Sequence, residues 1–326
     1  MIRKAIYEDL PELMEVFRKA REIMRESGNM NQWNDGYPSE DIVMKDIDEG
    51  VCYVLCEPDM TDGGRSDITC KERIIATMAF IPGPDPTYAK IYDGQWIDES
   101  PYYVIHRIAA AEPGKNAAST LLDWAFSQTD NIRIDTHRDN VIMHHILGRH
   151  GFAHCGMIYL ANGDPREAYQ MSLKVNKYKT LYNHAKCYFD GEDDMIANMA
   201  NLSAMIHRVF KFWWTGFYRV CPKDSGTSDE SHELVLGPFQ GPTACTRIAY
   251  GRGVCGSAWK KGETIVVPDV EEFPGHIACS SESRSEIVVP VWRDGHIVAV
   301  LDIDSEKLGT FTETDRYWLE KIVSHI

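Results

Sequence analysis

The order of helix-like and strand-like segments changes once along the chain, near Lys174, and this change limits the possible folds more than any other feature. Before it, helical and strand periodicities alternate; after it, two helix-like segments precede a run of strand-like segments and a last helix. The chain has 326 residues, more than the roughly 250 at which a single core usually stops growing. We therefore predict two domains, residues 1–173 and 174–326.

The first domain opens with an amphipathic segment at 9–27, where apolar residues recur at helical spacing. Strand-like and helix-like runs follow, with a polar, glycine-rich loop at 57–72 between the first two strands. The strand-like runs are 51–55, 73–81, 102–110, 131–137 and 152–160, and the helix-like runs are 119–128 and 140–150. This order predicts an α/β domain, a mixed sheet with flanking helices.

The second domain begins with two helix-like segments within 177–210, separated by "DGED". An Asp-Gly hairpin signal at 293–296 joins the last two strand-like runs, and a capping pattern, Thr312-x-x-Asp315, starts a final helix. The strand-like runs are 214–220, 232–239, 246–250, 264–270, 286–292 and 297–304. Helices before and after such strands predict an α/β sandwich of the α+β kind with a mostly antiparallel sheet.

Charge and cysteine content narrow the partners and the compartment. The formal net charge of −15 argues against nucleic acid and anionic membranes, which would repel the protein. The N-terminus carries acidic residues where a signal peptide needs an apolar core, and no uncharged run reaches the roughly 18 residues of a membrane span. Nine cysteines without a secretory signal favour reduced thiols. We expect a cytoplasmic protein.

Three cysteines in the second domain, Cys245, Cys255 and Cys279, lie beside glycine or other small residues. A zinc site that includes His276 is disfavoured because the cysteine spacing contains no C-x2-4-C knuckle, so we predict no metal site. Buried bystander thiols would not explain the neighbouring glycines, which usually mark strained turns or close approach of a ligand. Thiol redox catalysis remains, in which one cysteine attacks a substrate and another resolves the oxidised product.

Carboxylates accompany these cysteines. Asp302 and Asp304 lie two residues apart on a strand, hence on one face, and Glu286 heads the neighbouring strand. An exposed strand end would explain the two aspartates alone. Beside the cysteines, clustered acids raise one another's pKa, so one can deliver a proton while another binds an ammonium group. Such a site suits an amino acid that carries an oxidised sulfur.

The second domain resembles the GAF-type free methionine-(R)-sulfoxide reductases at "WTGFY", "LGPFQG", "GRGVCG", "FPGHIAC", "SRSEIVVP" and "VLDIDS". The resemblance implies that Cys279 attacks the sulfoxide sulfur of free methionine sulfoxide, giving methionine and a sulfenic acid. It implies that Cys245 and Cys255 resolve this product and that thioredoxin, supplied by NADPH, reduces the disulfide without a bound cofactor.

By the same resemblance, Glu286, Asp302 and Asp304 bind the substrate's α-ammonium group and protonate the departing oxygen. Trp214 and Tyr218 would hold the S-methyl end, although core packing would also place two aromatic residues on one face of a strand. The segment "KDSGTSDES" lengthens a loop relative to this family. Because GAF-type domains often pair through their helices, we also expect a homodimer.

The first domain resembles the GNAT superfamily of N-acetyltransferases at "VIHRIAA", "NIRIDTHRDN", "HGFAHCGMIYL" and "AYQM". This implies binding of acetyl-CoA at a turn before a helix, where backbone N–H groups meet the pyrophosphate. The implied cofactor-binding residues are Ile108, Gly114, Lys115, Asn116, Ala118 and Asn140. Leu147 stands where the family often has a general-acid tyrosine, and the acetyl acceptor stays open. The alternative function is a GNAT acetyltransferase whose GAF domain only senses a small ligand.

Overall fold

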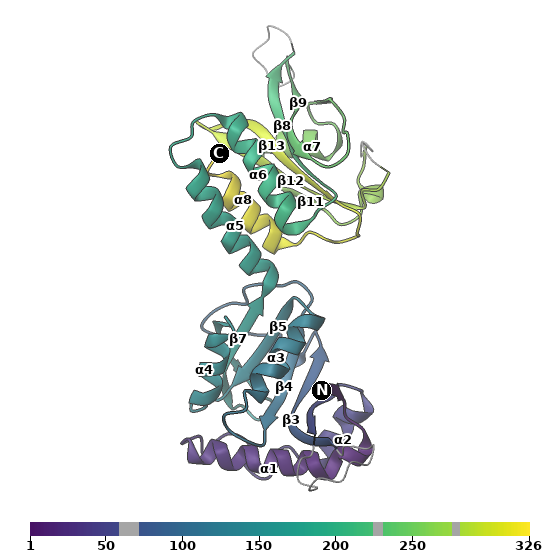
Figure 1. Cartoon of the computed structure of the whole chain (residues 1–326). Coiled ribbons are helices and arrows are strands. Elements are labelled where there is room, and N and C mark those ends of the chain that lie inside the picture. The colour runs from purple at the N-terminus through teal and green to yellow at the C-terminus, as the bar shows by residue number, and fades with distance from the viewer. Residues whose placement is uncertain (59–71, 224–230, 276–280) are drawn as a thin grey trace. The chain divides into compact units, whose positions relative to one another are not determined.

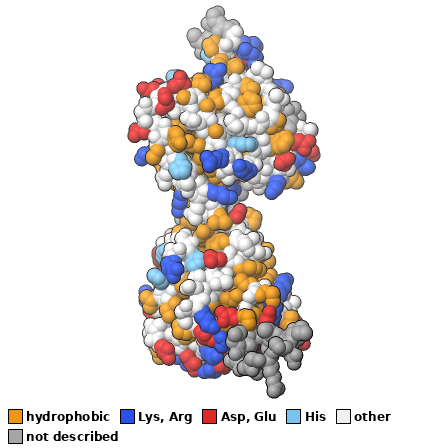
Figure 2. Space-filling model, in the orientation of Figure 1, with side chains coloured by type: hydrophobic (Ala, Val, Ile, Leu, Met, Phe, Trp, Pro, Cys, Tyr) orange, Lys and Arg blue, Asp and Glu red, His pale blue; other side chains and the backbone are white. Residues whose placement is uncertain are grey.

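The computed structural model describes residues 1–58, 72–223, 231–275 and 281–326. The chain divides into two compact units, Met1–Lys174 and Val175–Ile326. Among the described residues, no helix combines the length and the apolar character that a bilayer crossing requires. On the face drawn in Figure 2, acidic and basic side chains are interspersed over both units, so the net negative charge is not gathered into one patch there.

The first unit is a mixed, seven-stranded sheet in the order β1-β2-β3-β4-β5-β7-β6, with helices on both faces (Figure 1). Its one parallel pair in the described ladders is β4 with β5, and the other neighbours are antiparallel. The strands are β1 (Ile2–Lys4), β2 (Cys52–Pro58), β3 (Glu72–Pro82), β4 (Tyr103–Ala110), β5 (Asn131–Thr136), β6 (Ala153–Tyr159) and β7 (Pro165–Ser172). The helices are α1 (Leu10–Glu26), α2 (Glu40–Asp48), α3 (Ala117–Gln128) and α4 (Val141–Arg149).

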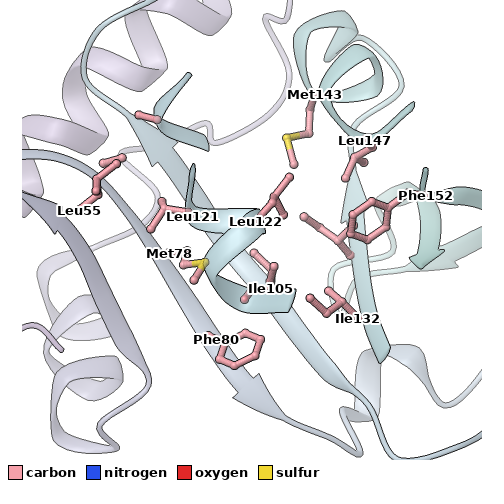
Figure 3. Close-up of a cluster of buried hydrophobic side chains, with 14 of the residues drawn as sticks. Leu55, Met78, Phe80, Ile105, Leu121, Leu122, Ile132, Met143, Leu147 and Phe152 are labelled. Carbon is pink, nitrogen blue, oxygen red and sulfur yellow. The ribbon is translucent and has the colours of Figure 1, made fainter. Parts of the chain in front are cut away.

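Two apolar cores hold this sheet between its helices. Figure 3 shows the core under α3 and α4, where Leu121, Leu122 and Leu147 pack against strand residues such as Met78 and Ile132. The opposite core joins α1 and α2 to the other face of the sheet. The expected α/β domain with flanking helices is confirmed. Strands β1 and β7 and helix α2 were not predicted as elements.

The parallel pairing of β4 with β5 ends at Ile105 and Ile134, although both strands continue. At the same place β4 carries a bulge opposite β3, and Arg107 adopts a left-handed backbone with φ of 53°. A bulge bends its strand and redirects the side chains next to it. The sheet therefore opens between the C-terminal halves of β4 and β5.

The second unit is a six-stranded sheet in the order β10-β9-β8-β13-β12-β11, and all its described ladders are antiparallel, as predicted. Helix α7 packs on one face, and Figure 1 shows α5, α6 and α8 grouped on the other. The strands are β8 (Trp214–Pro222), β9 (His232–Gln240), β10 (Arg247–Ala249), β11 (Ile265–Val267), β12 (Ser285–Arg293) and β13 (His296–Ser305). The helices are α5 (Leu173–Phe189), α6 (Met195–Phe210), α7 (Gly253–Lys261) and α8 (Glu313–Val323).

Two local predictions in this unit are confirmed. The hairpin between β12 and β13 turns at Asp294 and Gly295, with φ of 52° and 78°, the left-handed pair that an Asp-Gly hairpin turn requires. Helix α8 begins with a reciprocal capping box between Thr312 and Asp315. Helix α7 was not predicted, because the three glycines in "GRGVCG" were interpreted as marks of a strained turn or of close approach of a ligand.

Candidate active site

Three neighbouring strands bring the acids of the second unit together. The register pairs Glu286 of β12 with Asp304 of β13, and Asp304 in turn with Trp214 of β8. Because side chains alternate along a strand, Asp302 lies on the same face as Asp304. This is the face that α7 covers, since Tyr218 and Cys255 share one apolar cluster there.

Burial and mutual repulsion keep protons on these acids. Glu286 and Asp302 are 5% and 7% exposed. Burial and the charges of Asp302 and Asp304 raise the pKa of Glu286 well above its ordinary value, and burial and the charge of Asp304 do the same for Asp302. Burial raises the pKa of Asp304 to about 6, although a 2.8 Å hydrogen bond from the Ser283 hydroxyl opposes the shift. The cluster therefore offers protonated carboxyl groups near neutral pH.

Cys255 lies on α7 and faces this cluster. Its Sγ atom and carboxylate oxygens of Glu286 and Asp302 lie within 4.8 Å of one another. A metal ion could use that spacing, but burial and the charge of Asp302 raise the pKa of the Cys255 thiol well above its ordinary value. Protons on the thiol and on the acids compete with a cation for the same atoms. The arrangement therefore favours a hydrogen-bonded network of protonated groups over a metal centre.

One oxygen of this cluster has no partner. Asp302 Oδ1 is buried and has no hydrogen-bond partner among the described residues. Asp302, Asp304, Glu286 and Cys255 all line one pocket. A buried carboxyl oxygen without a partner costs roughly 1–3 kcal/mol, which a polar ligand group would recover. The pocket is therefore suited to a ligand with a polar group that forms a hydrogen bond with this carboxyl.

The two predicted aromatic residues hold the segment that carries Cys245. The Trp214 indole N–H donates to the Pro242 carbonyl at 3.1 Å, and the Tyr218 hydroxyl donates to the Cys245 carbonyl at 3.0 Å. Both side chains also line the acid pocket. They thus fix the position of Cys245 relative to the acids, in addition to providing an apolar wall.

Two glycines allow the close approach of neighbouring elements around the acid pocket. A Cβ atom at Gly216 would lie 2.5 Å from the ring of Trp214 and 2.4 Å from Phe239, so only glycine lets the indole fold over β8. A Cβ atom at Gly256 of α7 would lie 2.5 Å from the carbonyl oxygen of Ala249. The glycines in "WTGFY" and "GRGVCG" thus mark close approach between elements.

The three predicted cysteines differ in state. Cys245 is disulfide-bonded. Cys255 is a free thiol and is 4% exposed. Cys279 and His276 lie outside the described residues, as does most of the "KDSGTSDES" segment. Ser283, which hydrogen-bonds Asp304, was not predicted because a lone serine before a strand carries no distinguishing pattern.

In the first unit, five of the six predicted cofactor-binding residues line one pocket with a volume of about 230 Å³. These residues are Ile108, Gly114, Asn116, Ala118 and Asn140. Asn116 caps α3 with a left-handed backbone, φ of 52°. Lys115 is not among the residues that line this pocket, and its ammonium group is paired with Glu57 at 2.8 Å and Glu112 at 3.1 Å.

Comparisons of the sequence with known proteins find relatives of the second unit. Residues 216–326 match the family model described as a GAF domain. The chain is 51% identical over 150 residues to "GAF domain-containing protein A" of Dictyostelium discoideum, spanning 46% of this chain and 90% of that protein. It is 41% identical over 164 residues to the free methionine-R-sulfoxide reductase of Saccharomyces cerevisiae, spanning 48% of this chain and 88% of that protein.

A solved structure of a GNAT-family acetyltransferase from Streptococcus agalactiae is 32% identical, with a TM-score of 0.45, and the match spans 53% of this chain and 94% of that one.

The two curated relatives are covered over most of their length at well above 30% identity. Through its GAF domain, the chain therefore belongs to the family of GAF-domain proteins that includes the free methionine-R-sulfoxide reductases.

Proposed function

We propose that the second unit reduces free L-methionine (R)-sulfoxide to methionine and that thioredoxin, supplied by NADPH, restores the enzyme. One observation carries this proposal: Asp302 presents a buried oxygen without a partner, inside a cluster of acids with raised pKa, in a pocket beside a disulfide-bonded cysteine. Only a substrate that needs both proton delivery and thiol chemistry makes use of all these features.

The charge of each acid determines its proposed role in binding or in proton transfer. A free amino acid carries an α-ammonium group, which an ionised carboxylate of the cluster binds, while a protonated neighbour donates its proton to the sulfoxide oxygen. The pKa of Asp304, about 6, lies below neutral pH, so Asp304 is the proposed carboxylate. Glu286 and Asp302, which are more deeply buried, are the proposed proton donors.

Cys279 and Cys245 carry out the proposed redox steps. The thiolate of Cys279 attacks the sulfoxide sulfur while a protonated acid of the cluster gives its proton to the sulfoxide oxygen. The oxygen then passes to the cysteine sulfur as its bond to the substrate sulfur breaks, so methionine leaves and a sulfenic acid remains on Cys279. The Cys245 thiol then displaces water from the sulfenic acid and forms a disulfide, which a dithiol such as thioredoxin reduces. Cys245 is proposed to resolve first because it is the described cysteine found in a disulfide.

Cys255 has a different proposed role. A thiol with a raised pKa is a poor nucleophile, because the thiolate is the attacking form. Its position beside Asp302 instead suits a hydrogen-bond donor that holds the acid cluster. Cys255 could resolve only after Cys245 is removed, which makes it a second resolver.

A single-turnover experiment tests this proposal. The reduced full chain is mixed with free methionine (R)-sulfoxide without any reductant, and methionine and remaining thiols are counted. We expect one methionine per chain, two thiols lost, and Cys245 in the disulfide by peptide mapping. Asp302→Asn should abolish the burst, whereas the matched exposed change Asp193→Asn should not. A full-length chain that forms no methionine would contradict the proposal and favour the ligand-sensor alternative.

We also propose that the first unit binds acetyl-CoA, because Gly114, Asn116 and Ala118 line one pocket at the N-terminus of α3. Backbone N–H groups at a helix N-terminus suit a pyrophosphate. The pocket also contains Asn140, whose side chain caps α4. Calorimetric titration of the full chain with coenzyme A tests this, and absence of binding would contradict it.

A further inference from the structure

A second and larger pocket of the first unit, with a volume of about 620 Å³, is not used by any step above. It lies where β4 and β5 diverge, and it shares Ile108, Asn140 and Met143 with the proposed coenzyme pocket. Its lining includes His106, Asp135 and Arg166. We propose that this pocket binds a free α-amino acid, whose amino group is acetylated with His106 as the general base.

His106 is oriented by a carboxylate on one side. Its Nε2 atom lies 2.9 Å from Asp85 Oδ2, and Asp85 also accepts the backbone N–H of Thr87 at 2.8 Å. Although burial opposes ionisation, these hydrogen bonds lower the pKa of Asp85 to about 2, so it accepts and cannot donate. In a neutral His106 ring, the hydrogen bond to Asp85 places the proton on Nε2 and leaves the lone pair on Nδ1.

The free lone pair faces a second carboxylate across a gap. His106 Nδ1 lies 3.8 Å from Asp135 Oδ1, a distance too long for a direct hydrogen bond. Asp135 is itself held by the Tyr88 hydroxyl, which donates to it at 2.6 Å. An ammonium nitrogen placed beside both atoms could donate one proton to each of them. The geometry thus matches a positively charged amine whose proton is removed by His106.

Arg166 indicates which second charged group the ligand carries besides its amine. Its side chain is 9% exposed, and its Nη1 donates to the Pro165 carbonyl at 2.9 Å. Its Nε and Nη2 make only long ion pairs, with Asp135 at 4.0 Å and Asp164 at 3.9 Å, beyond hydrogen-bond distance. Arg107, by contrast, is engaged by both oxygens of Asp46 at 2.7 Å and 2.8 Å. The Arg166 guanidinium can therefore take up a ligand carboxylate close to the ammonium position. An α-amino acid carries these two groups side by side.

The chemistry balances with an acetyl thioester as the co-reactant. Acetyl-CoA supplies the acetyl carbonyl: the amine nitrogen bonds to its carbon, the carbon–sulfur bond breaks, and the thiolate leaves and takes up the second amine proton. His106 Nδ1 removes the first ammonium proton, which Asp85 favours by stabilising the resulting imidazolium. Asp135 holds the ammonium before this transfer, and Arg166 holds the carboxylate throughout.

The test uses the full chain and a binding readout that does not need turnover, because the inference rests on the proposed acetyl-CoA binding. Coenzyme A is titrated first. The standard free L-amino acids and their carboxamides are then titrated into the coenzyme-bound chain. We expect the carboxamide of each amino acid that binds to bind about 10- to 100-fold more weakly, since it lacks the charge that Arg166 recognises. Arg166→Gln should remove this difference.

Acetylation is then measured by mass of the N-acetyl product. His106→Gln should retain amino acid binding and lower the acetylation rate about 100-fold. His154→Gln is the matched control, because His154 is paired with Glu167 outside this pocket, and its rate should not change. Binding of coenzyme A with equal affinity for amino acids and carboxamides, or full activity of His106→Gln, would overturn the inference alone. Failure to bind coenzyme A would overturn both proposals for this unit.

Discussion

Asp304→Asn should change the pH dependence of stability in the second unit. Asparagine has the shape of a protonated aspartate and can still accept the hydrogen bond from Ser283. The pKa of Asp304 is raised from 3.8 to about 6 by burial, so its carboxyl is harder to ionise in the folded chain than in the unfolded chain. The substitution therefore removes a charge that the fold disfavours.

The magnitude follows from linkage. A carboxyl whose folded pKa is raised contributes stability that is fully present below the unfolded pKa, near 3.8, and is lost as the pH rises through about 6. A shift of about 2 pKa units corresponds to at most about 3 kcal/mol. We expect Asp304→Asn to be more stable than the parent by up to that amount at pH 8 and to match the parent near pH 4.

Urea unfolding of the full chain at both pH values measures this difference, with hydrogen exchange of β12 and β13 peptides to report on the second unit. Asp193→Asn, at an exposed position between α5 and α6, is the control and should give no pH-dependent difference. Equal effects of Asp304→Asn at pH 4 and pH 8 would refute the reasoning, because a pH-independent change cannot come from ionisation.

Three further results are expected. Gly216→Ala should destabilise the second unit by about 1–3 kcal/mol in urea unfolding, because its Cβ would overlap the buried ring of Trp214 and the Cβ of Phe239. Gly148→Ala in α4, which has open space around it, should be neutral or stabilising. Tyr218→Phe removes the hydrogen bond to the Cys245 carbonyl. It should slow disulfide formation after the first turnover without lowering methionine release in that turnover. Equal losses of methionine release and of disulfide formation would contradict a role of Tyr218 in positioning Cys245. Cys255→Ser should retain thioredoxin-linked turnover, since serine can still donate to the acids; complete loss would make Cys255 the main resolver.

Sequence patterns predicted those parts of the molecule whose causes are local. The Asp294-Gly295 turn, the Thr312 capping box and the two-residue spacing of Asp302 and Asp304 each depend on a few adjacent residues. Helix α7 escaped prediction because its glycines disfavour a helix locally, and the close packing of Gly256 on Ala249 that they permit is a tertiary effect.

The remaining parts of the site depend on contacts between distant segments. The register that sets Glu286 opposite Asp304 and the approach of Cys255 to these acids arise only when the strands and α7 assemble. His106 and Asp135 meet in the same way, because β4 and β5 become neighbours only after the chain passes through α3. The spacing of residues along the chain does not indicate these contacts between distant segments.

The central claim is that the second unit is a thiol-dependent reductase of free methionine sulfoxide. Thioredoxin-coupled NADPH consumption with free L-methionine (R)-sulfoxide, comparing the parent chain with Cys279→Ser, tests it most directly. We predict steady turnover in the parent and none in the variant, with no turnover of the (S)-sulfoxide by either. A folded parent chain that consumes no NADPH, or a Cys279→Ser chain that turns over at the parental rate, would contradict the account.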